Sequence, residues 1–416
     1  MFLKSIHIKN YRQFENLGLD LTYPKGHRKE GEPLEKICII GDNGTGKTTL
    51  LDLILNYYWH GFDKGDLPNP FYLEYTTVDF RQDTELKFTN TKHPINLKQE
   101  YADVNAKILF FPTGINLPSS LKEKEDTINA EDAAKKSIYD LNNSETLKIW
   151  EQLRSSMKPS IEKELLYRLE SLKGMKNQND IHELKTVLSK IEKFKADNQN
   201  DYDKFAEFLN PLLRRFHLKL NTKIDLDKFD EIRFLDLRAK DGTIIPMEKW
   251  STGIRQLIYT ILPLYALKPE TGIIMIDEAE NSLYPNTQRS IIDFYKSVCP
   301  DMQLIIATHS PILASSFEPW EVIELKFNEK GKVERKPYFK GENHVDNYHI
   351  RPMYLQWDSL FMKMFGLDTD SNEERNDMLM ELAILKRDLK KSSGADKEAL
   401  QEKYETLAEQ LDWATL

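Results

Sequence analysis

A glycine-rich loop near the N-terminus contains the first residues whose types and spacing suggest chemistry. Residues 41–48 read GDNGTGKT, a phosphate-loop pattern in which glycines let the backbone turn tightly and point its N–H groups inward. Lys47 is expected to reach the β- and γ-phosphates of a nucleotide, and Thr48 to hold Mg²⁺. The candidate phosphate-binding residues are Asn43, Gly44, Thr45, Gly46, Lys47, Thr48 and Thr49.

Two carboxylates and an imidazole follow apolar runs further along the chain. Asp277 and Glu278 end the run at residues 272–276, and His309 follows the run at residues 303–307. A carboxylate at the carboxyl end of a strand faces the ligand-binding edge of an open α/β sheet. Asp277 is therefore expected to complete the Mg²⁺ shell through water, Glu278 to position or deprotonate the attacking water, and His309 to contact the γ-phosphate. Alone, an acid pair can cap a helix and a histidine can be structural, but their occurrence together with the loop favours a phosphoryl-transfer site.

A third segment, residues 250–253, opens a helix. Ser251 is well placed as the N-cap of this helix, so the segment can be read simply as a capped helix. The serine hydroxyl, the flexible Gly253 and the free N–H groups of the helix also form an anion site. Apolar residues then recur at helical spacing at Ile254, Leu257, Ile258, Ile261 and Leu262.

The elements that would position these residues predict an α/β fold. Residues 36–40, 272–276 and 303–307 are short apolar runs, typical of buried parallel strands. Residues 48–55 continue from the loop as an apolar helix whose N-terminus favours phosphate. Residues 71–111 contain alternating polar and apolar pieces, which suggest an antiparallel sheet flanking the nucleotide site.

A helical insertion divides the predicted ATPase head into two halves. Residues 1–115 are expected to form the first half and residues 230–327 the second, which opens with a hairpin over residues 232–245. Residues 116–229 are expected to form a compact helical arm or hairpin, a short coiled-coil arm at most, because a helix of about 27 residues spans only about 40 Å. Residues 328–416 are predicted as a helical C-terminal region whose hairpin packs on the head or docks a partner. Its two amphipathic stripes are Leu382, Leu385 and Leu389, and Leu400, Tyr404, Leu407 and Leu411.

The composition is that of an ordinary soluble protein. The chain has 416 residues, of which 30% are charged and 40% hydrophobic, enough for two or three domains. No apolar run approaches the ~20 residues that span a bilayer, and the N-terminus lacks a secretory pattern, so no membrane association is expected. Cys38 and Cys299 form no disulfide framework, which suits a cytoplasmic location.

The net charge of −9 does not indicate nucleic-acid binding by the chain as a whole. Any DNA-binding surface therefore has to be a local cluster of basic residues. Two basic clusters qualify, although each is also compatible with an ordinary solvated helix face. The first comprises Arg214, Arg215, His217, Lys219 and Lys223, and the second Lys386, Arg387, Lys390 and Lys391.

The order of these motifs resembles that of the ABC-type ATPase superfamily. Residues 251–253, Ser-Thr-Gly, match its Ser-x-Gly signature, with Trp250 in place of the usual leucine, and residues 281–283 fall where its D-loop lies. By this resemblance the chain binds ATP and Mg²⁺, and Ser251 and Gly253 cap the γ-phosphate of ATP held by the opposite subunit. The resemblance thus implies a homodimer or higher homo-oligomer formed through the heads.

Three further segments resemble one branch of this superfamily, the AAA family ATPases of the SMC, RecF and OLD type. Residues 2–14 resemble the opening strand and turn of such heads, and by that resemblance Arg12 touches nucleotide phosphate. Residues 277–285 (DEAENSLYP) and 308–311 (THSP) look closest to OLD-type ATPases. Transporter ATPases carry a glutamine soon after the second strand, and this sequence leaves the choice between Gln82 and Gln99 open.

No nuclease is expected after the head, although OLD proteins carry one there. Asp368 and Asp370 look like a metal pair, but Ser371 and Glu374 form a capping box that makes both acids favourable residues at a helix start. The chain resembles compact anti-phage defence ATPases, such as those of Septu and PARIS, which implies control of a separately encoded nuclease or toxin. The alternative is a RecF-like repair or maintenance ATPase that binds DNA directly; a transporter subunit fits less well.

Overall fold

The computed structural model describes residues 2–59, 76–80, 85–86, 106–113, 137–175, 181–222, 235–336, 373–393 and 395–411. The chain divides into two compact units, Met1–Tyr354 and Leu355–Leu416. The predicted glutamines Gln82 and Gln99, the acids Asp368 and Asp370, and Lys223 of the first basic cluster lie outside the described residues.

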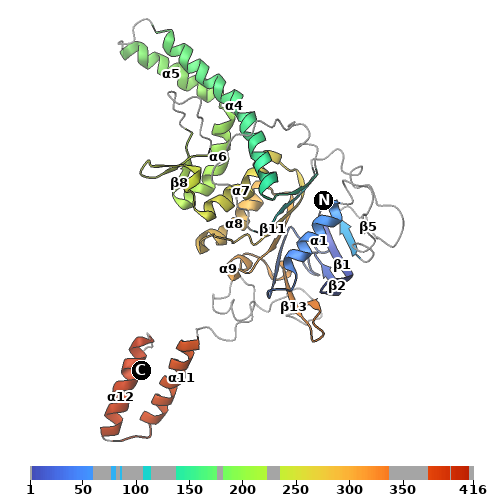
Figure 1. Ribbon diagram of the computed structural model, residues 1–416, viewed down its shortest axis with the longest axis vertical. Helices are drawn as coiled ribbons and strands as arrows, with labels where there is room; N and C mark the ends of the chain where they lie inside the picture. The colour runs from blue at the N-terminus through green and yellow to red at the C-terminus, as the bar shows by residue number, and fades with distance from the viewer. Residues whose placement is uncertain are drawn as a thin grey trace. The chain divides into compact units, whose positions relative to one another are not determined.

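A mixed sheet forms the centre of the first unit (Figure 1). Its order in the described part of the chain is β5-β4-β1-β2-β14-β13-β3-β12-β11-β6-β7. The six strands from β13 to β7 run parallel, with β12 between β3 and β11. The fold is therefore α/β with a parallel core, as predicted. The bounds are β3 (Lys36–Gly41), β6 (Ala106–Phe111), β7 (Ile138–Asp140), β11 (Thr271–Asp277), β12 (Met302–Ala307) and β13 (Val322–Phe327).

The parallel strands are buried along almost their whole length, which is why they appear in the sequence as continuous apolar runs. Every residue of β6 and β12 is buried, and β11 is buried from its second residue onward. The register aligns Ile276 of β11 with Ile306 of β12, and Ile306 with Cys38 of β3. The carboxyl ends of these three strands therefore meet at one edge of the sheet.

Antiparallel strands extend the sheet on the side of β13. The strand β1 pairs with both β2 and β4, so the flanking sheet predicted from residues 71–111 is joined by the N-terminal strands. The strand β14 lies inside the range 328–416, which was predicted to be helical. It forms because a turn at Asn328 and Gly331 brings the chain back beside β13. The bounds are β1 (Leu3–Tyr11), β2 (Phe14–Asp20), β4 (Thr76–Phe80), β5 (Glu85–Leu86) and β14 (Val333–Arg335).

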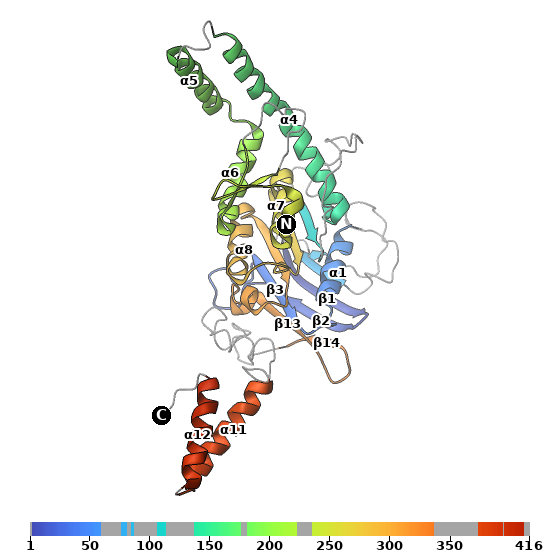
Figure 2. The ribbon, with the colours of Figure 1, turned by 60° about the vertical axis from the view of Figure 1, so that its left-hand side comes forward.

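Three helices form most of the predicted insertion: α4 (Asn143–Lys173), α5 (Ile181–Asp197) and α6 (Asp201–Leu213). The helix α4 has 31 residues, hence a length of about 46 Å at 1.5 Å per residue. Its N-terminal half packs on the head, and its C-terminal half forms a hairpin with α5 that projects from the sheet (Figure 2). Tyr167 of α4 stacks on Phe194 of α5 with 3.8 Å between ring centroids. The strand β7 and the start of α4 thus belong to the head, although they fall within the range 116–229.

A small antiparallel sheet follows α6 and leads back to the head. Its strands are β8 (Leu218–Leu220), β9 (Leu237–Ala239) and β10 (Ile244–Ile245), and the pairing of β9 with β10 is the described part of the predicted hairpin. The helix α7 (Thr252–Leu267) follows one 3-10 turn later. Two helices, α8 (Pro285–Val298) and α9 (Pro311–Ala314), begin shortly after β11 and β12.

The second unit contains a helical hairpin of α11 (Glu373–Leu389) and α12 (Ala395–Gln410). The two predicted apolar stripes pack against each other in one cluster, to which all their members except Leu400 belong. Its buried residues are Leu382, Tyr404, Ala408 and Leu411. Both cysteines, which lie in the first unit, are buried free thiols. Among the helices of the described residues, none combines the length and apolar character needed to cross a bilayer.

Candidate nucleotide-binding site

The glycine-rich loop joins the end of β3 to the first residue of α1 (Lys47–Trp59). Gly44 and Gly46 have φ angles of 83° and 89°, in the region that favours glycine. Thr45 is fully buried, and its Oγ1 donates to the carbonyl of Asp42 at 2.8 Å. The Lys47 ammonium donates to the carbonyls of Gly41 at 2.8 Å and Asp42 at 3.1 Å. The loop thus curls around the ammonium group of its own lysine.

Asp277 joins the loop helix to two strand ends. Its side chain is 3% exposed, and its Oδ2 accepts hydrogen bonds from the hydroxyls of Thr48 and Thr113, each at 2.7 Å. One carboxylate with hydroxyl oxygens is a hard-oxygen donor set, which Mg²⁺ favours when substrate phosphates supply other ligands. In the described part of the chain, no group of three His, Cys, Asp or Glu side chains is placed to hold a metal. The carboxylate of Asp277 and the hydroxyl of Thr48 fit a Mg²⁺ that arrives with nucleotide.

Glu278 has an unusual backbone conformation directly after β11. Its φ angle of 54° lies in the left-handed region, which costs a residue other than glycine about 1–3 kcal/mol. Its backbone N–H donates to the carbonyl of Ala307 at 2.9 Å, so the turn is held by the end of β12. Partial burial, then the charges of Asp277 and Glu280, raise the pKa of the Glu278 carboxyl, while His309 and Lys47 oppose this rise. Such a carboxyl is suited to accept a proton.

His309 is exposed at the end of β12 and is tied to the turn after β11. Its backbone N–H donates to Oε1 of Glu280 at 2.8 Å, while Oε2 of Glu280 is buried with no hydrogen-bond partner in the described residues. Glu280 therefore fixes the position of His309 relative to Glu278. This makes Glu280 a positioning residue, a role that its place in the sequence motif did not indicate.

Two substitutions of Glu280 are expected to distinguish the effect of this hydrogen bond on activity from the effect of the negative charge. Glu280→Ala removes the acceptor for His309 and is expected to lower kcat about tenfold or more, because a hydrogen bond involving a charged group contributes about 1.5–3 kcal/mol. Glu280→Gln keeps an oxygen acceptor and is expected to stay within about threefold of the wild-type kcat. Steady-state phosphate release measures both. Equal loss in the two variants would show that the charge, not the hydrogen bond, is what matters.

Negative charge predominates around the loop lysine. Burial lowers the pKa of Lys47, and the carboxylates of Asp277, Asp42, Glu278 and Glu280 oppose this change. Four carboxylates around one ammonium leave an excess of negative charge. A cation that accompanies an anionic triphosphate would offset this charge, which agrees with the oxygen donors at Asp277.

The turn between β1 and β2 abuts the loop and carries Arg12. A Cβ atom added at Gly46 would collide with the side-chain amide of Gln13, so the turn lies directly against the loop. Arg12 is exposed, has a φ angle of 50°, and lies 5.3 Å from the centroid of the Tyr11 ring. No hydrogen bond joins Arg12 to the loop within the described residues. Its proposed contact with nucleotide phosphate stays a prediction.

Phe327 is another neighbour of the loop that sequence reasoning missed. It ends β13, its side chain is 45% exposed, and a Cβ atom at Gly44 would lie 3.9 Å from its ring. An exposed aromatic ring beside a phosphate loop is suited to pack against a nucleotide base. Thr113 was also missed, although its place just after the apolar strand β6 was a usable signal.

The Ser-x-Gly segment lies at the start of α7. Ser251 is exposed, and its Oγ accepts from the backbone N–H of Ile254 at 3.4 Å, so it caps the helix as expected. Gly253 is buried, and a Cβ atom there would overlap the carbonyl oxygen of Ser282. Among the described residues, no hydrogen bond or ion pair joins Ser251 or Gly253 to the loop at residues 41–48. The structure thus brings together Lys47, Thr48, Asp277, Glu278 and His309 but not these two residues.

These features define the class of the protein. A parallel sheet that delivers a glycine-rich loop, a buried aspartate and a glutamate to one edge is the head of a P-loop nucleoside triphosphatase. Two overlapping stretches, residues 1–167 and 75–314, match the family described as the AAA ATPase domain, and the chain belongs to that family. The protein is therefore an ATPase, as predicted.

Two curated relatives and one solved structure show similarity to this chain. The retron Ec83 probable ATPase of Escherichia coli is 24% identical, over 79% of this chain and 72% of the relative. The Septu protein PtuA of Bacillus thuringiensis is 29% identical, over 34% of this chain and 44% of the relative. The SMC head domain from Thermotoga maritima shares 12% identity, with a TM-score of 0.41, over 82% of this chain and 100% of that one. The family match and the curated relatives confirm the predicted kinship with AAA family defence ATPases.

Proposed function

We propose that this ATPase is a nucleotide-dependent switch whose heads pair around ATP. The observation that carries the proposal is the separation within one chain of the two halves of a complete site. Lys47, Thr48, Asp277 and Glu278 converge at one sheet edge. Ser251 is an exposed helix cap that, in the described part of the chain, forms no hydrogen bond or ion pair with the loop. An exposed helix N-terminus with a hydroxyl and a glycine is suited to bind the γ-phosphate on a second copy.

The roles proposed for the site follow from its geometry. Lys47 and the loop N–H groups hold the β- and γ-phosphates, and Thr48 and Asp277 would hold Mg²⁺. The metal, when bound, offsets the charge that develops on the phosphates. Glu278 orients and deprotonates the attacking water, and His309 contacts the γ-phosphate. Ser251 and Gly253 of the opposite head complete the site, so that hydrolysis releases the pair.

A switch of this kind needs something that reads its state. The similarity to the Septu protein PtuA and to the retron Ec83 probable ATPase supports a role in anti-phage defence. We therefore propose that the paired state controls a separate effector, a nuclease or toxin, and that the chain works on or near DNA.

Light scattering of a Glu278→Gln variant tests the pairing. This variant is expected to bind ATP without hydrolysing it, and its mass is expected to double when Mg²⁺ and ATP are added. The matched control is the Glu278→Gln variant with Ser251→Arg, which places a bulky cation at the exposed cap and is expected to keep the nucleotide-free mass. If ATP leaves the mass of a monomeric Glu278→Gln chain unchanged, the two-head proposal fails.

A further inference from the structure

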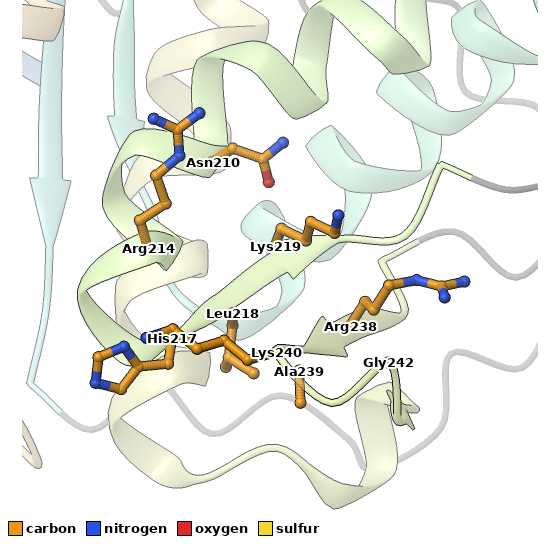
Figure 3. Close-up of a pocket in the computed structure, with 9 residues that line it drawn as sticks. All are labelled: Asn210, Arg214, His217, Leu218, Lys219, Arg238, Ala239, Lys240 and Gly242. Carbon is orange, nitrogen blue, oxygen red and sulfur yellow. The ribbon is translucent and has the colours of Figure 1, made fainter.

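A basic pocket lies away from the nucleotide site, between the end of α6 and the strands β8 and β9 (Figure 3). The cavity has a volume of about 480 Å³. Five of its lining residues are basic in type: Arg214, His217, Lys219, Arg238 and Lys240. We refer to these five residues as the basic pocket. The sequence cluster supplied three of them, and the fold adds Arg238 and Lys240 from β9 and the turn after it.

The backbone brings the five side chains together in two ways. After α6, a 3-10 turn at Arg214–Phe216 ends at His217, whose φ angle of 60° reverses the chain into β8. The strand β8 then pairs antiparallel with β9, and the register places Lys219 directly opposite Arg238. Like charges directly opposite in an antiparallel pair are destabilising. The cost in stability of placing Lys219 opposite Arg238 is explained if these two side chains bind an anionic ligand.

Carboxylates of the described residues do not pair with the side chains of the basic pocket. In the described residues, none of its five side chains forms an ion pair, and Arg238 donates only to Oδ1 of Asn221, at 2.9 and 3.3 Å. The adjacent Asp241 is engaged in its own turn, where its carboxylate accepts from the backbone N–H of Thr243 at 2.9 Å. Arg214, His217, Lys219 and Lys240 are exposed. These four side chains are open to solvent, and Arg238 is half-buried beside them, in a chain whose net charge is −9.

The composition of the lining indicates the class of ligand. Among the described residues, its apolar members are Leu218 and Ala239, and no Phe, Tyr or Trp lines it. Protein partners are usually anchored by buried aromatic or large apolar side chains, which the lining does not offer. Interfaces with nucleic acid are polar and strongly positive, and most of their contacts go to phosphates. We propose that the basic pocket binds the phosphodiester backbone of nucleic acid without reading its sequence.

This inference rests on the proposed function only in taking nucleic acid as the partner. Nucleic-acid binding by the pocket and pairing of the heads are therefore measured in separate experiments. Binding is measured on the full chain without nucleotide, by fluorescence anisotropy of a labelled mixed-sequence DNA at several salt concentrations. Single-stranded DNA, duplex DNA and RNA of the same sequence are compared, which shows the form of nucleic acid that is preferred. Head pairing is measured separately with ATP and without nucleic acid, so either proposal can fail alone.

Two neighbouring arginines provide a matched pair of variants. Arg214 lines the pocket, whereas Arg215 is also exposed on the same turn but is not among the lining residues. Arg214→Ala and Lys219→Ala are each expected to weaken binding about tenfold, the effect of losing one charge-assisted contact. Each is also expected to reduce the slope of log affinity against log salt by about 0.9 for duplex and about 0.7 for single strands. Arg215→Ala is expected to change neither quantity.

Three results would overturn the proposal. The first is an absence of binding to every nucleic acid at low salt. The second is an equal loss of affinity in Arg214→Ala and Arg215→Ala, which would assign binding to overall charge. The third is displacement of DNA by polyglutamate at an equal concentration of negative charge, which would assign the pocket to an acidic protein. Preference for nucleic acid over polyglutamate, lost in Lys219→Ala, would support it.

Discussion

A Glu278→Gln variant is expected to hydrolyse ATP about 10²–10⁴-fold more slowly than the wild-type chain, because a general base contributes about that factor to proton transfer. Glutamine fills the same volume and can adopt the same turn, but its amide cannot accept the proton of the attacking water. Lys47, Thr48 and Asp277 hold their places by contacts that do not involve the Glu278 side chain. ATP affinity is therefore expected to be unchanged, and the loss to fall on kcat alone.

Phosphate release under saturating ATP measures kcat, and a fluorescent ATP analogue measures affinity. Glu207→Gln is the matched control, since Glu207 is exposed on α6, outside the nucleotide site. It removes the same charge and is expected to leave both quantities unchanged. If the Glu278→Gln variant keeps more than about a tenth of the wild-type kcat, Glu278 is not the general base. Another group, with His309 the first candidate, would then activate the water.

The part of the site that could be predicted from sequence lies at the ends of apolar strands. Thr48 and Asp277 are 229 positions apart, yet a 2.7 Å hydrogen bond joins them. The sequence predicted that they would lie close together, because each follows a buried apolar run. Parallel strands align their carboxyl ends, so a motif after each run is brought to a common edge whatever the order of the strands. The same reasoning located His309.

What could not be predicted depends on strand order and register. Thr113 reaches Asp277 because β6 is the strand next to β11, and no local pattern states which strands are neighbours. The pairing of Lys219 with Arg238 depends on a register that a slip of one residue would abolish. Gln303 is a further case: it is fully buried within an apolar strand, where its amide bonds the backbone of Leu3 and Leu34.

The same limit applies to the boundaries of the elements. The sequence predicted a change to helices after residue 327, but the chain turns back and adds β14 beside β13. That strand has only three residues, Val333–Arg335, too few to show an alternating pattern. Its position is set by pairing with strands already present. A short strand of this kind, which lies between β2 and β13, takes its conformation from the strands it joins.

Mixed dimers of two inactive variants are expected to recover activity if the site is shared between heads. Lys47→Ala removes the loop lysine but leaves Ser251 intact, whereas Ser251→Arg blocks the exposed cap but leaves the loop intact. Each variant alone should be inactive, because each of its two identical sites lacks one half. In a symmetric pair, a mixed dimer carries one complete site out of two, so about half of the wild-type rate per dimer is expected.

Co-expression of the two variants with different affinity tags, and purification through both tags, gives the mixed dimer directly. The matched control combines Lys47→Ala with Glu278→Gln, two changes in the same half of the site, and no recovery is expected from it. If the Lys47→Ala and Ser251→Arg pair is as inactive as this control, Ser251 does not act on the ATP of a neighbour. The exposed cap of α7 would then be only a helix cap, and the switch would have to operate within one chain. Recovery in the first pair alone would leave a site built from two chains as the explanation, because no single chain in that mixture contains both halves.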